Sequence, residues 1–126
     1  MEMRFYRCEI CGQIVAVIHK TGAPLHCCGK PMTEIIPGTV EASREKHIPT
    51  AEIRDGVLLV RVGSVDHPMT PEHWIEWIAV QTKYGNQRKQ LLPGQAPAAH
   101  FLLEDGDEVL AVYAYCNLHG LWKYEP

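Results

Sequence analysis

The sequence predicts an all-β fold in which a small metal-binding module precedes a seven-stranded antiparallel sandwich or barrel of the immunoglobulin type. Three observations support this prediction. Four of the five cysteines precede residue 30, short apolar segments alternate with turn residues over the rest of the chain, and 46% of the residues are hydrophobic, which is enough for a core. We therefore expect two domains, residues 1–36 and residues 37–126.

The first 36 residues have the pattern of a compact metal module. Short strands at 5–7 and 13–18 flank the pair Cys8-x-x-Cys11, and a turn at 21–24 precedes the adjacent pair Cys27-Cys28. So few residues bury little apolar surface, so we expect a metal to organise the module. The segment 37–39, Pro-Gly-Thr, is the expected junction.

The apolar segments in the remainder of the chain predict seven short strands, and turn residues separate most of them. The segment 74–82 is assigned to a strand and not to a helix because it is rich in Trp, Ile and Val. The predicted strands are 50–54, 57–62, 74–82, 87–92, 98–103, 108–115 and 121–124, with turns at 55–56, 85–86, 93–94 and 105–106.

Composition narrows the function classes. The formal net charge is −3 and no basic run occurs, which argues against nucleic-acid binding. No stretch has the length of a membrane span and the N-terminus lacks an apolar signal region, so we expect a cytoplasmic protein. The odd number of cysteines, five, favours metal thiolates over a disulfide framework.

The four N-terminal cysteines, Cys8, Cys11, Cys27 and Cys28, have the composition of a tetrahedral thiolate site. Such a site suits zinc or a single iron. The adjacent pair is unusual for a zinc ribbon, which generally uses a second Cys-x-x-Cys. Spacing alone leaves both a structural zinc and a redox-active iron open.

A second group of potential ligands lies at the ends of predicted strands, where loops of a sandwich can converge. Its members are His47, His67, His73, Cys116 and His119. Four imidazoles and a thiolate are more ligands than the four that a structural zinc binds. A blue-copper centre is the nearest competitor, but no Met follows His119. Imidazoles around a plane with a thiolate below would leave one octahedral position open, which favours a ferrous site that binds a small anion. His19, His26 and His100 fit neither group, and we expect them to bind no metal.

Several motifs resemble one protein family, and the resemblance extends over essentially the whole chain. The N-terminal cysteines with Cys27-Cys28-Gly29-x-Pro31-Met32 resemble desulforedoxin and the N-terminal module of desulfoferrodoxin. Four further segments resemble the superoxide reductase domain of that family: Glu45-Lys46-His47-Ile48-Pro49, His67-Pro68-Met69, His73-Trp74-Ile75-Glu76-Trp77 and Cys116-Asn117-Leu118-His119-Gly120-Leu121-Trp122.

The resemblance implies a role for each residue. Cys8, Cys11, Cys27 and Cys28 would hold one iron in an Fe(Cys)4 centre. His47, His67, His73 and His119 would be the equatorial ligands of a second iron, and Cys116 its axial ligand. Two catalytic residues are implied as well: Glu45 would occupy the sixth position of the oxidised iron, and Lys46 would attract superoxide and assist protonation. Residues 1–36 would form the desulforedoxin-like module and residues 37–126 the superoxide reductase domain.

The reaction implied by the resemblance is the one-electron reduction of superoxide to hydrogen peroxide, with detoxification in an anaerobe or microaerophile. An external donor such as rubredoxin would re-reduce the iron, and the protein would be a homodimer. A non-catalytic electron carrier with the same ligands is the alternative. The lysine beside His47 favours the enzyme, because a carrier needs no group that attracts an anion.

Overall fold

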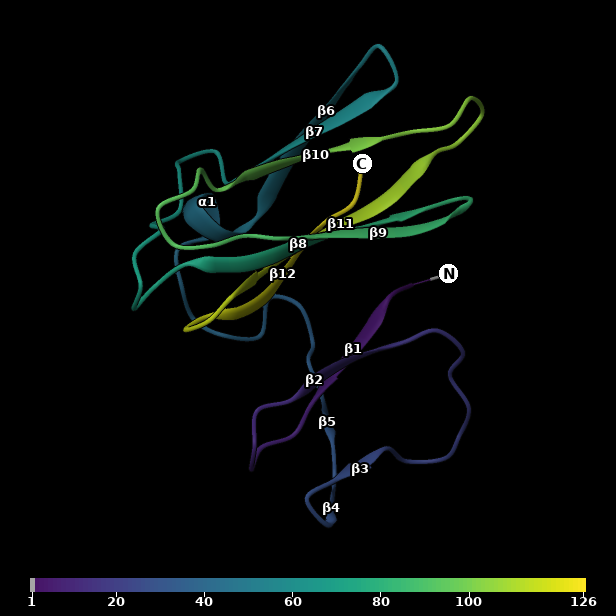
Figure 1. The fold of residues 1–126 in the computed structure, drawn as a ribbon, viewed down its shortest axis with the longest axis vertical. Helices are drawn as coiled ribbons and strands as arrows, with labels where there is room; N and C mark the ends of the chain where they lie inside the picture. The colour runs from purple at the N-terminus through teal and green to yellow at the C-terminus, as the bar shows by residue number, and fades with distance from the viewer. Residues whose placement is uncertain (1) are drawn as a thin grey trace. The chain divides into compact units, whose positions relative to one another are not determined.

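The structure, a computed structural model, describes residues 2–126. The chain separates into two compact units, residues 1–36 and residues 37–126, and each has its own strands (Figure 1). The described residues are almost entirely β-strand and loop, with one short helix, so the predicted all-β class is confirmed. None of the described residues belongs to a helix that is long and apolar enough to cross a lipid bilayer.

The N-terminal unit contains a three-stranded antiparallel sheet and a small hairpin. The sheet has the order β2-β1-β5, formed by Ile14–Val17, Arg4–Arg7 and Thr33–Glu34, and the hairpin pairs β3, His26–Cys27, with β4, Lys30–Pro31. Phe5 and Tyr6 are the buried side chains of β1. This apolar interior is small, as expected for a unit that a metal helps to organise.

The second unit has two antiparallel sheets. One has the order β10-β7-β6 and consists of Ala98–Leu102, Val57–Val62 and Pro49–Arg54. The other has the order β12-β11-β8-β9 and consists of Gly120–Tyr124, Val109–Cys116, Ile75–Thr82 and Gly85–Gln90. Three strands facing four is the arrangement of an immunoglobulin-like sandwich, in agreement with the prediction.

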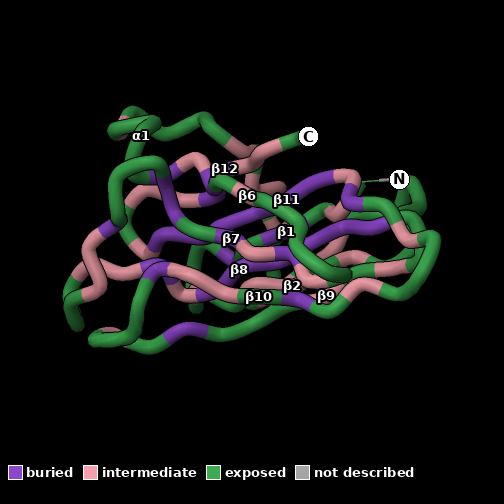
Figure 2. The backbone as a smooth tube through the Cα atoms, turned by 90° about the horizontal axis from the view of Figure 1, so that it is seen from above, coloured by how far each residue is buried: buried purple, intermediate pink, exposed green. Residues whose placement is uncertain are grey.

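The core of this unit lies between the two sheets. Alternate residues of β7 (Leu58, Val60 and Val62) contact the inward residues of the larger sheet, and Figure 2 shows buried positions along β7, β8 and β11. Period-two alternation directs one face of each strand inward. The core cluster extends to Cys116, which is fully buried at the end of β11. The potential axial sulfur is therefore fixed by the core itself.

The predicted strands of both units have counterparts in the structure; the strand at 57–62 coincides with β7, and the ends of the others differ by at most two residues. The turn at Asp55-Gly56 is confirmed: both residues have positive φ, 49° and 76°, which suits a two-residue hairpin turn. The predicted turn at 85–86 is wrong. Thr82 pairs with Gly85, so the turn residues are Lys83 and Tyr84. A hydrogen bond from a distant side chain favours this position of the turn, because the Asp107 carboxylate accepts a hydrogen bond from the Tyr84 amide at 3.1 Å.

The sequence analysis missed four short elements, the strands β3, β4 and β5 of the first unit and the helix α1 of the second. The helix α1, Arg44–His47, is a single turn that carries Glu45, Lys46 and His47. A helix of four residues is too short to show a 3.6-residue periodicity, so no pattern could indicate it. Its position matters, because it places one potential ligand at the end of the molecule where the loops after β7 and β11 meet.

Candidate metal centres

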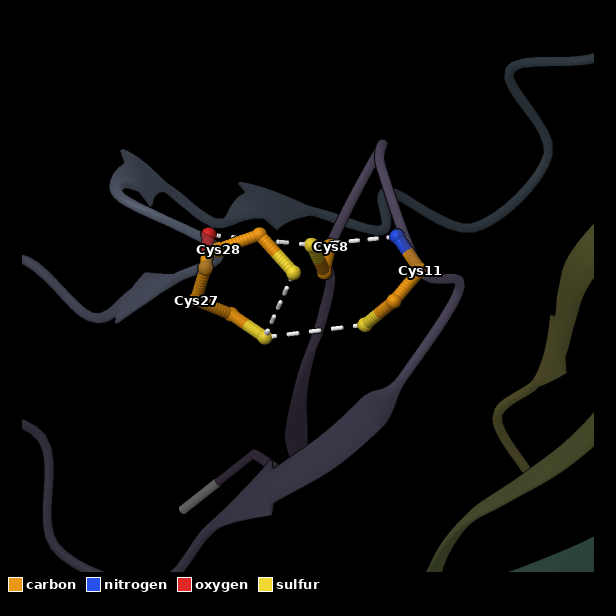
Figure 3. Close-up of side chains that lie close together, drawn as sticks. All are labelled: Cys8, Cys11, Cys27 and Cys28. Carbon is orange, nitrogen blue, oxygen red and sulfur yellow. Dashed lines mark hydrogen bonds between the residues drawn. The ribbon is translucent and has the colours of Figure 1, made fainter.

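The four N-terminal cysteines converge on a common point (Figure 3). Their sulfurs lie within 4.8 Å of one another, with 3.6 Å between Cys11 and Cys27 and 4.0 Å between Cys27 and Cys28. A tetrahedral site with metal–sulfur bonds of ~2.3 Å requires sulfurs about 3.8 Å apart. The donor set and its spacing therefore fit a single tetrahedral metal.

The local backbone explains how two adjacent cysteines can face one metal. Cys28 has a φ of 54°, in the left-handed region, and Gly29 follows with a φ of 75°. Successive residues of an extended strand would point to opposite sides, so this turn is what brings both sulfurs to the same side. In the other half of the site, the Cys11 amide lies 3.5 Å from the Cys8 sulfur and donates to it.

The thiol pKa values of this group are shifted in opposite directions. The amide of Cys11, followed by that of Ile10, lowers the pKa of Cys8 to about 6. Interaction with the Cys11 side chain raises the pKa of Cys27 to about 12. One thiolate forms readily, whereas further negative charges in the same small space oppose one another. A bound metal cation removes this conflict and releases the remaining thiol protons.

The second cluster gathers residues from four segments of the second unit. His47 comes from α1, His67 and His73 from the loop between β7 and β8, and Cys116 from the end of β11. Ligand atoms of these four residues lie within 4.8 Å of one another. His119, in the turn between β11 and β12, joins them through Nδ1, which lies 3.1 Å from His47 Nε2 and 3.9 Å from the Cys116 sulfur.

The four imidazoles form a ring in the order His47, His67, His73, His119. Neighbouring rings have centroids 4.6–5.1 Å apart and are nearly perpendicular, at 79–82°. The rings of His47 and His73, which lie opposite each other, are 6.4 Å apart and are inclined by 31°. The ring nitrogens that meet, such as those of His67 and His47 at 3.1 Å, match the ~3 Å expected for ligands at right angles on ~2.1 Å bonds.

Hydrogen bonds fix the protonation of two of these rings. His47 Nδ1 donates to the Ser43 carbonyl at 2.6 Å, and His67 Nδ1 donates to the Pro68 carbonyl at 2.7 Å. A carbonyl only accepts, so in each neutral ring Nε2 carries a lone pair and no proton. Two such lone pairs then face each other at 3.1 Å, and His73 Nε2 is buried with no hydrogen-bond partner in the described part of the chain. These atoms fit a metal ligand set and nothing else nearby satisfies them.

Burial sets the electrostatics of this cluster. Desolvation lowers the pKa of His67 to about 4 and also lowers the pKa of His47 and of His73. The three rings are therefore neutral near pH 7 and ready to coordinate. Burial raises the pKa of the Cys116 thiol, so metal binding must displace its proton.

The predicted catalytic residues lie beside this cluster. Glu45 and Lys46 precede His47 in α1, and both side chains are exposed. The Lys46 charge is the last of the causes that lower the pKa of His47 and of His73, after burial and the neighbouring histidines. His19, His26 and His100 belong to neither cluster, as expected, and all three are exposed.

Two site residues were not singled out from the sequence. The Trp122 ring lies against His47, with centroids 5.0 Å apart, and its Nε1 donates to the His119 carbonyl at 3.0 Å. Gly63 lies where an added Cβ would be 2.5 Å from the Glu45 carbonyl oxygen. Both roles depend on contacts between distant segments, so no local pattern could reveal them.

Comparison with known proteins agrees with this geometry. The family model described as "Desulfoferrodoxin" matches residues 39–125, and the one described as "Desulfoferrodoxin, N-terminal domain" matches residues 1–35. The chain belongs to the desulfoferrodoxin family. It is 45% identical over 124 residues to the desulfoferrodoxin of Syntrophotalea carbinolica, covering 98% of this chain and 97% of that protein. The desulfoferrodoxin homolog of Archaeoglobus fulgidus is 46% identical over 96% of this chain and 95% of its own length.

Solved structures of superoxide reductases support the same assignment. The superoxide reductase from Treponema pallidum has a TM-score of 0.84 and 38% identity, covering 99% of this chain and 100% of that chain. The one-iron superoxide reductase from Giardia intestinalis has a TM-score of 0.55 and 34% identity, covering 65% of this chain and 97% of that chain. The predicted family and the predicted enzyme class, superoxide reductase, are therefore confirmed.

Proposed function

We propose that the chain reduces superoxide to hydrogen peroxide at the cluster of His47, His67, His73, His119 and Cys116. One superoxide, two protons and one electron give one hydrogen peroxide, and no oxygen is released. The observation that carries this proposal is the ring of neutral imidazoles around a buried sulfur. Iron bound there supplies the electron. The residues of the chain determine the charge of the iron site, the access of superoxide to it and the delivery of protons.

The ligand set favours a redox metal over a structural one. Neutral imidazoles add no charge, and Cys116 contributes one negative charge, so the occupied site is net positive and attracts an anion. Cys116 is fully buried, so its sulfur is shielded from solvent and from a second thiol. As a thiolate, Cys116 would increase the electron density of a metal held there, which would favour transfer of an electron to the substrate.

The two charged residues of α1 have separate proposed roles. Lys46 is exposed beside the imidazoles, where its ammonium attracts superoxide and can supply a proton through water. Glu45 is exposed in the same turn, and its carboxylate is proposed to approach the metal after the substrate has been reduced. The backbone of Glu45 is held in place, because its carbonyl accepts a hydrogen bond from the Val65 amide at 3.0 Å.

The N-terminal unit is proposed to hold a second iron through Cys8, Cys11, Cys27 and Cys28. The exposed positions of Cys11 and Cys28 would allow an external donor to pass electrons to this centre. We propose a rubredoxin-like protein as the donor, a homodimeric assembly and a cytoplasmic location. The superoxide reductase from Giardia intestinalis is a one-iron enzyme, which supports the histidine cluster as the site of the reaction.

The test uses the salt dependence of the reaction with superoxide. Lys46→Ala should slow the bimolecular step by about ten-fold or more, because steering supplies factors of that size. The wild-type rate should fall as salt rises, since an exposed charge is screened over about 10 Å at 0.1 M. The variant should show a weaker salt dependence, and Glu45→Ala should keep or quicken the first capture while changing the ferric spectrum.

Lys83→Ala is the matched control for this test. Lys83 is exposed in the turn between β8 and β9, so its loss makes the same change in net charge away from the cluster. Stopped-flow mixing with pulsed superoxide gives the rates. Equal rates for wild type and Lys46→Ala at low salt would reject the steering role. A protein with iron in the cluster that fails to consume superoxide would reject the enzyme in favour of an electron carrier.

A further inference from the structure

Asn117 lies between two of the potential ligands, Cys116 and His119, in the turn after β11. Its side chain reaches a different loop, the one between β7 and β8 that carries His73. The Asn117 Oδ1 accepts the Trp74 amide at 2.9 Å, and Asn117 Nδ2 donates to the Glu72 carbonyl at 2.9 Å. The Asn117 amide also donates to the Trp74 carbonyl at 3.3 Å.

These bonds enclose His73 from both sides. Glu72 and Trp74 are its two neighbours in the chain, and each is bonded to Asn117. His73 itself is bonded to Thr70, whose amide donates to the His73 carbonyl at 2.9 Å and whose carbonyl accepts the His73 amide at 3.1 Å. The backbone on each side of this ligand is therefore hydrogen-bonded, either within its own turn or to the turn that follows Cys116.

The orientation of the Asn117 amide is determined by its partners. Trp74 presents an N–H, which requires an acceptor, and Glu72 presents a carbonyl oxygen, which requires a donor. A rotated amide would place two donors together on one side and two acceptors together on the other. A single planar group with one donor and one acceptor thus matches both backbone groups, and no other uncharged side chain of this length does so.

We propose that Asn117 is the positioning residue that fixes His73 against Cys116 and His119 for metal binding. It acts through backbone groups and touches none of the ligand atoms. The inference rests on the proposed function, because it takes these three residues as ligands of one metal. Partners behind the ligands typically change metal affinity by about 10- to 100-fold when removed. His73 Nε2 is buried and has no hydrogen-bond partner in the described part of the chain, so it is the atom whose position the Asn117 hydrogen bonds would fix.

The experiment measures iron affinity at both centres of the full chain by competition with a chelator. Asn117→Ala should weaken the histidine cluster by about ten-fold or more, while the cysteine site of the same molecule serves as the internal control and keeps its affinity. Asn117→Asp keeps the acceptor for Trp74 but loses the donor to Glu72, so its effect should be intermediate. Asn86→Ala, an exposed asparagine of β9, should change neither centre.

A double-mutant cycle with His73→Ala separates positioning from general stability. If Asn117 acts through His73, the two losses in affinity should not add, whereas losses from independent causes would add. The absorption of the thiolate-ligated iron gives a second readout, and it should shift in Asn117→Ala. Unchanged affinity in both Asn117 variants would overturn the proposal while leaving the site intact. Unchanged affinity in His73→Ala and in Cys116→Ser would instead overturn the proposed site itself.

Discussion

Individual residues of the histidine cluster are kept in a protonation state that suits coordination. His67 is 3% exposed, and its Nδ1 proton is committed to the Pro68 carbonyl. Both features favour the neutral ring with a free Nε2. A ring of this kind gains a favourable partner only when a cation enters, so the empty cluster should be a weak point of the folded apoprotein.

This state predicts how the apoprotein responds to acid. The pKa of His67 is about 4 when folded and 6.5 in a model peptide, so between these values only the unfolded chain binds the proton. The His67 contribution to the free energy of unfolding should therefore be complete above pH 6.5 and should fall as the pH drops toward 4, by on the order of 3 kcal/mol. Urea unfolding of metal-free protein at pH 7 and pH 5 measures it.

His67→Gln should remove the His67 part of this dependence and leave the part due to His47 and His73, whereas His100→Gln, at an exposed position of β10, should leave all of it in place. A pH profile that is identical in wild type and His67→Gln would contradict the prediction.

Trp122 supports two potential ligands with one side chain, and its replacement can separate the two contacts. Trp122→Phe keeps a ring against His47 but loses the donor to the His119 carbonyl, at a cost of about 1 kcal/mol. Trp122→Leu also loses the ring contact, so iron affinity at the histidine cluster should fall in the order wild type, Phe, Leu. Chelator competition and thermal melting measure both effects, and equal affinities in the two variants would show that only the hydrogen bond matters.

At the level of elements, the histidine cluster depends on the contact between α1 and the loop after β7. The Glu45 carbonyl accepts the Val65 amide at 3.0 Å and the Ser64 hydroxyl at 3.3 Å. Gly63 makes this approach possible because it has no side chain at the point of closest contact. The contact joins the element that carries His47 to the loop that carries His67.

Gly63→Ala should therefore disturb both stability and metal binding. Its Cβ would lie 2.5 Å from the Glu45 carbonyl oxygen and 2.8 Å from that of Ile48, and neither backbone group can rotate away. We expect a loss of about 1–3 kcal/mol in the free energy of unfolding, with weaker binding at the histidine cluster. Gly22→Ala, where nothing lies within 4 Å of the added Cβ, is the control and should be neutral. Equal melting temperatures for the two variants would show that the α1 contact is not tight.

The elements differed in how far the sequence could predict them. Strands such as β7 and β11 follow from alternating or continuous apolar residues between turn residues. The helix α1 could not be predicted because its four residues are too few to show a periodicity, and the turn at 83–84 could not be predicted because it depends on a hydrogen bond to the distant Asp107. The residues of both clusters were named from spacing and resemblance, whereas their arrangement, such as the ring order around His47 and the contacts of Asn117, is set by tertiary structure. The roles of Glu45 and Lys46 stay predictions.

At the scale of the whole molecule, each compact unit contains a complete set of potential ligands for its own metal. The four cysteines belong to residues 1–36, and the histidine cluster belongs to residues 37–126. No residue of either set comes from the other unit. Binding at one site should therefore be independent of binding at the other to a first approximation.

Cys27→Ser tests this independence. It should abolish the tetrahedral thiolate site, because one of the four sulfurs is lost, while iron in the histidine cluster keeps its absorption and its rate with superoxide. Two rates of the variant are then compared. One is turnover with an external protein donor, and the other is the reaction of the reduced histidine cluster with superoxide in a single encounter. A single-encounter rate that falls along with the N-terminal iron would contradict independence and would show that the two centres act together.

The separation of the ligands along the chain also orders their assembly during synthesis. Nineteen residues separate Cys8 from Cys27, so a ribosome completes the thiolate set early. His47 and His119 are 72 residues apart, so the histidine set is complete only after every strand up to β11 has been made. Because domains generally fold in the order in which they emerge, the first iron can enter a nascent chain, whereas the second must wait for a nearly finished sandwich. A cell short of iron would therefore accumulate molecules that carry the first metal and lack the second.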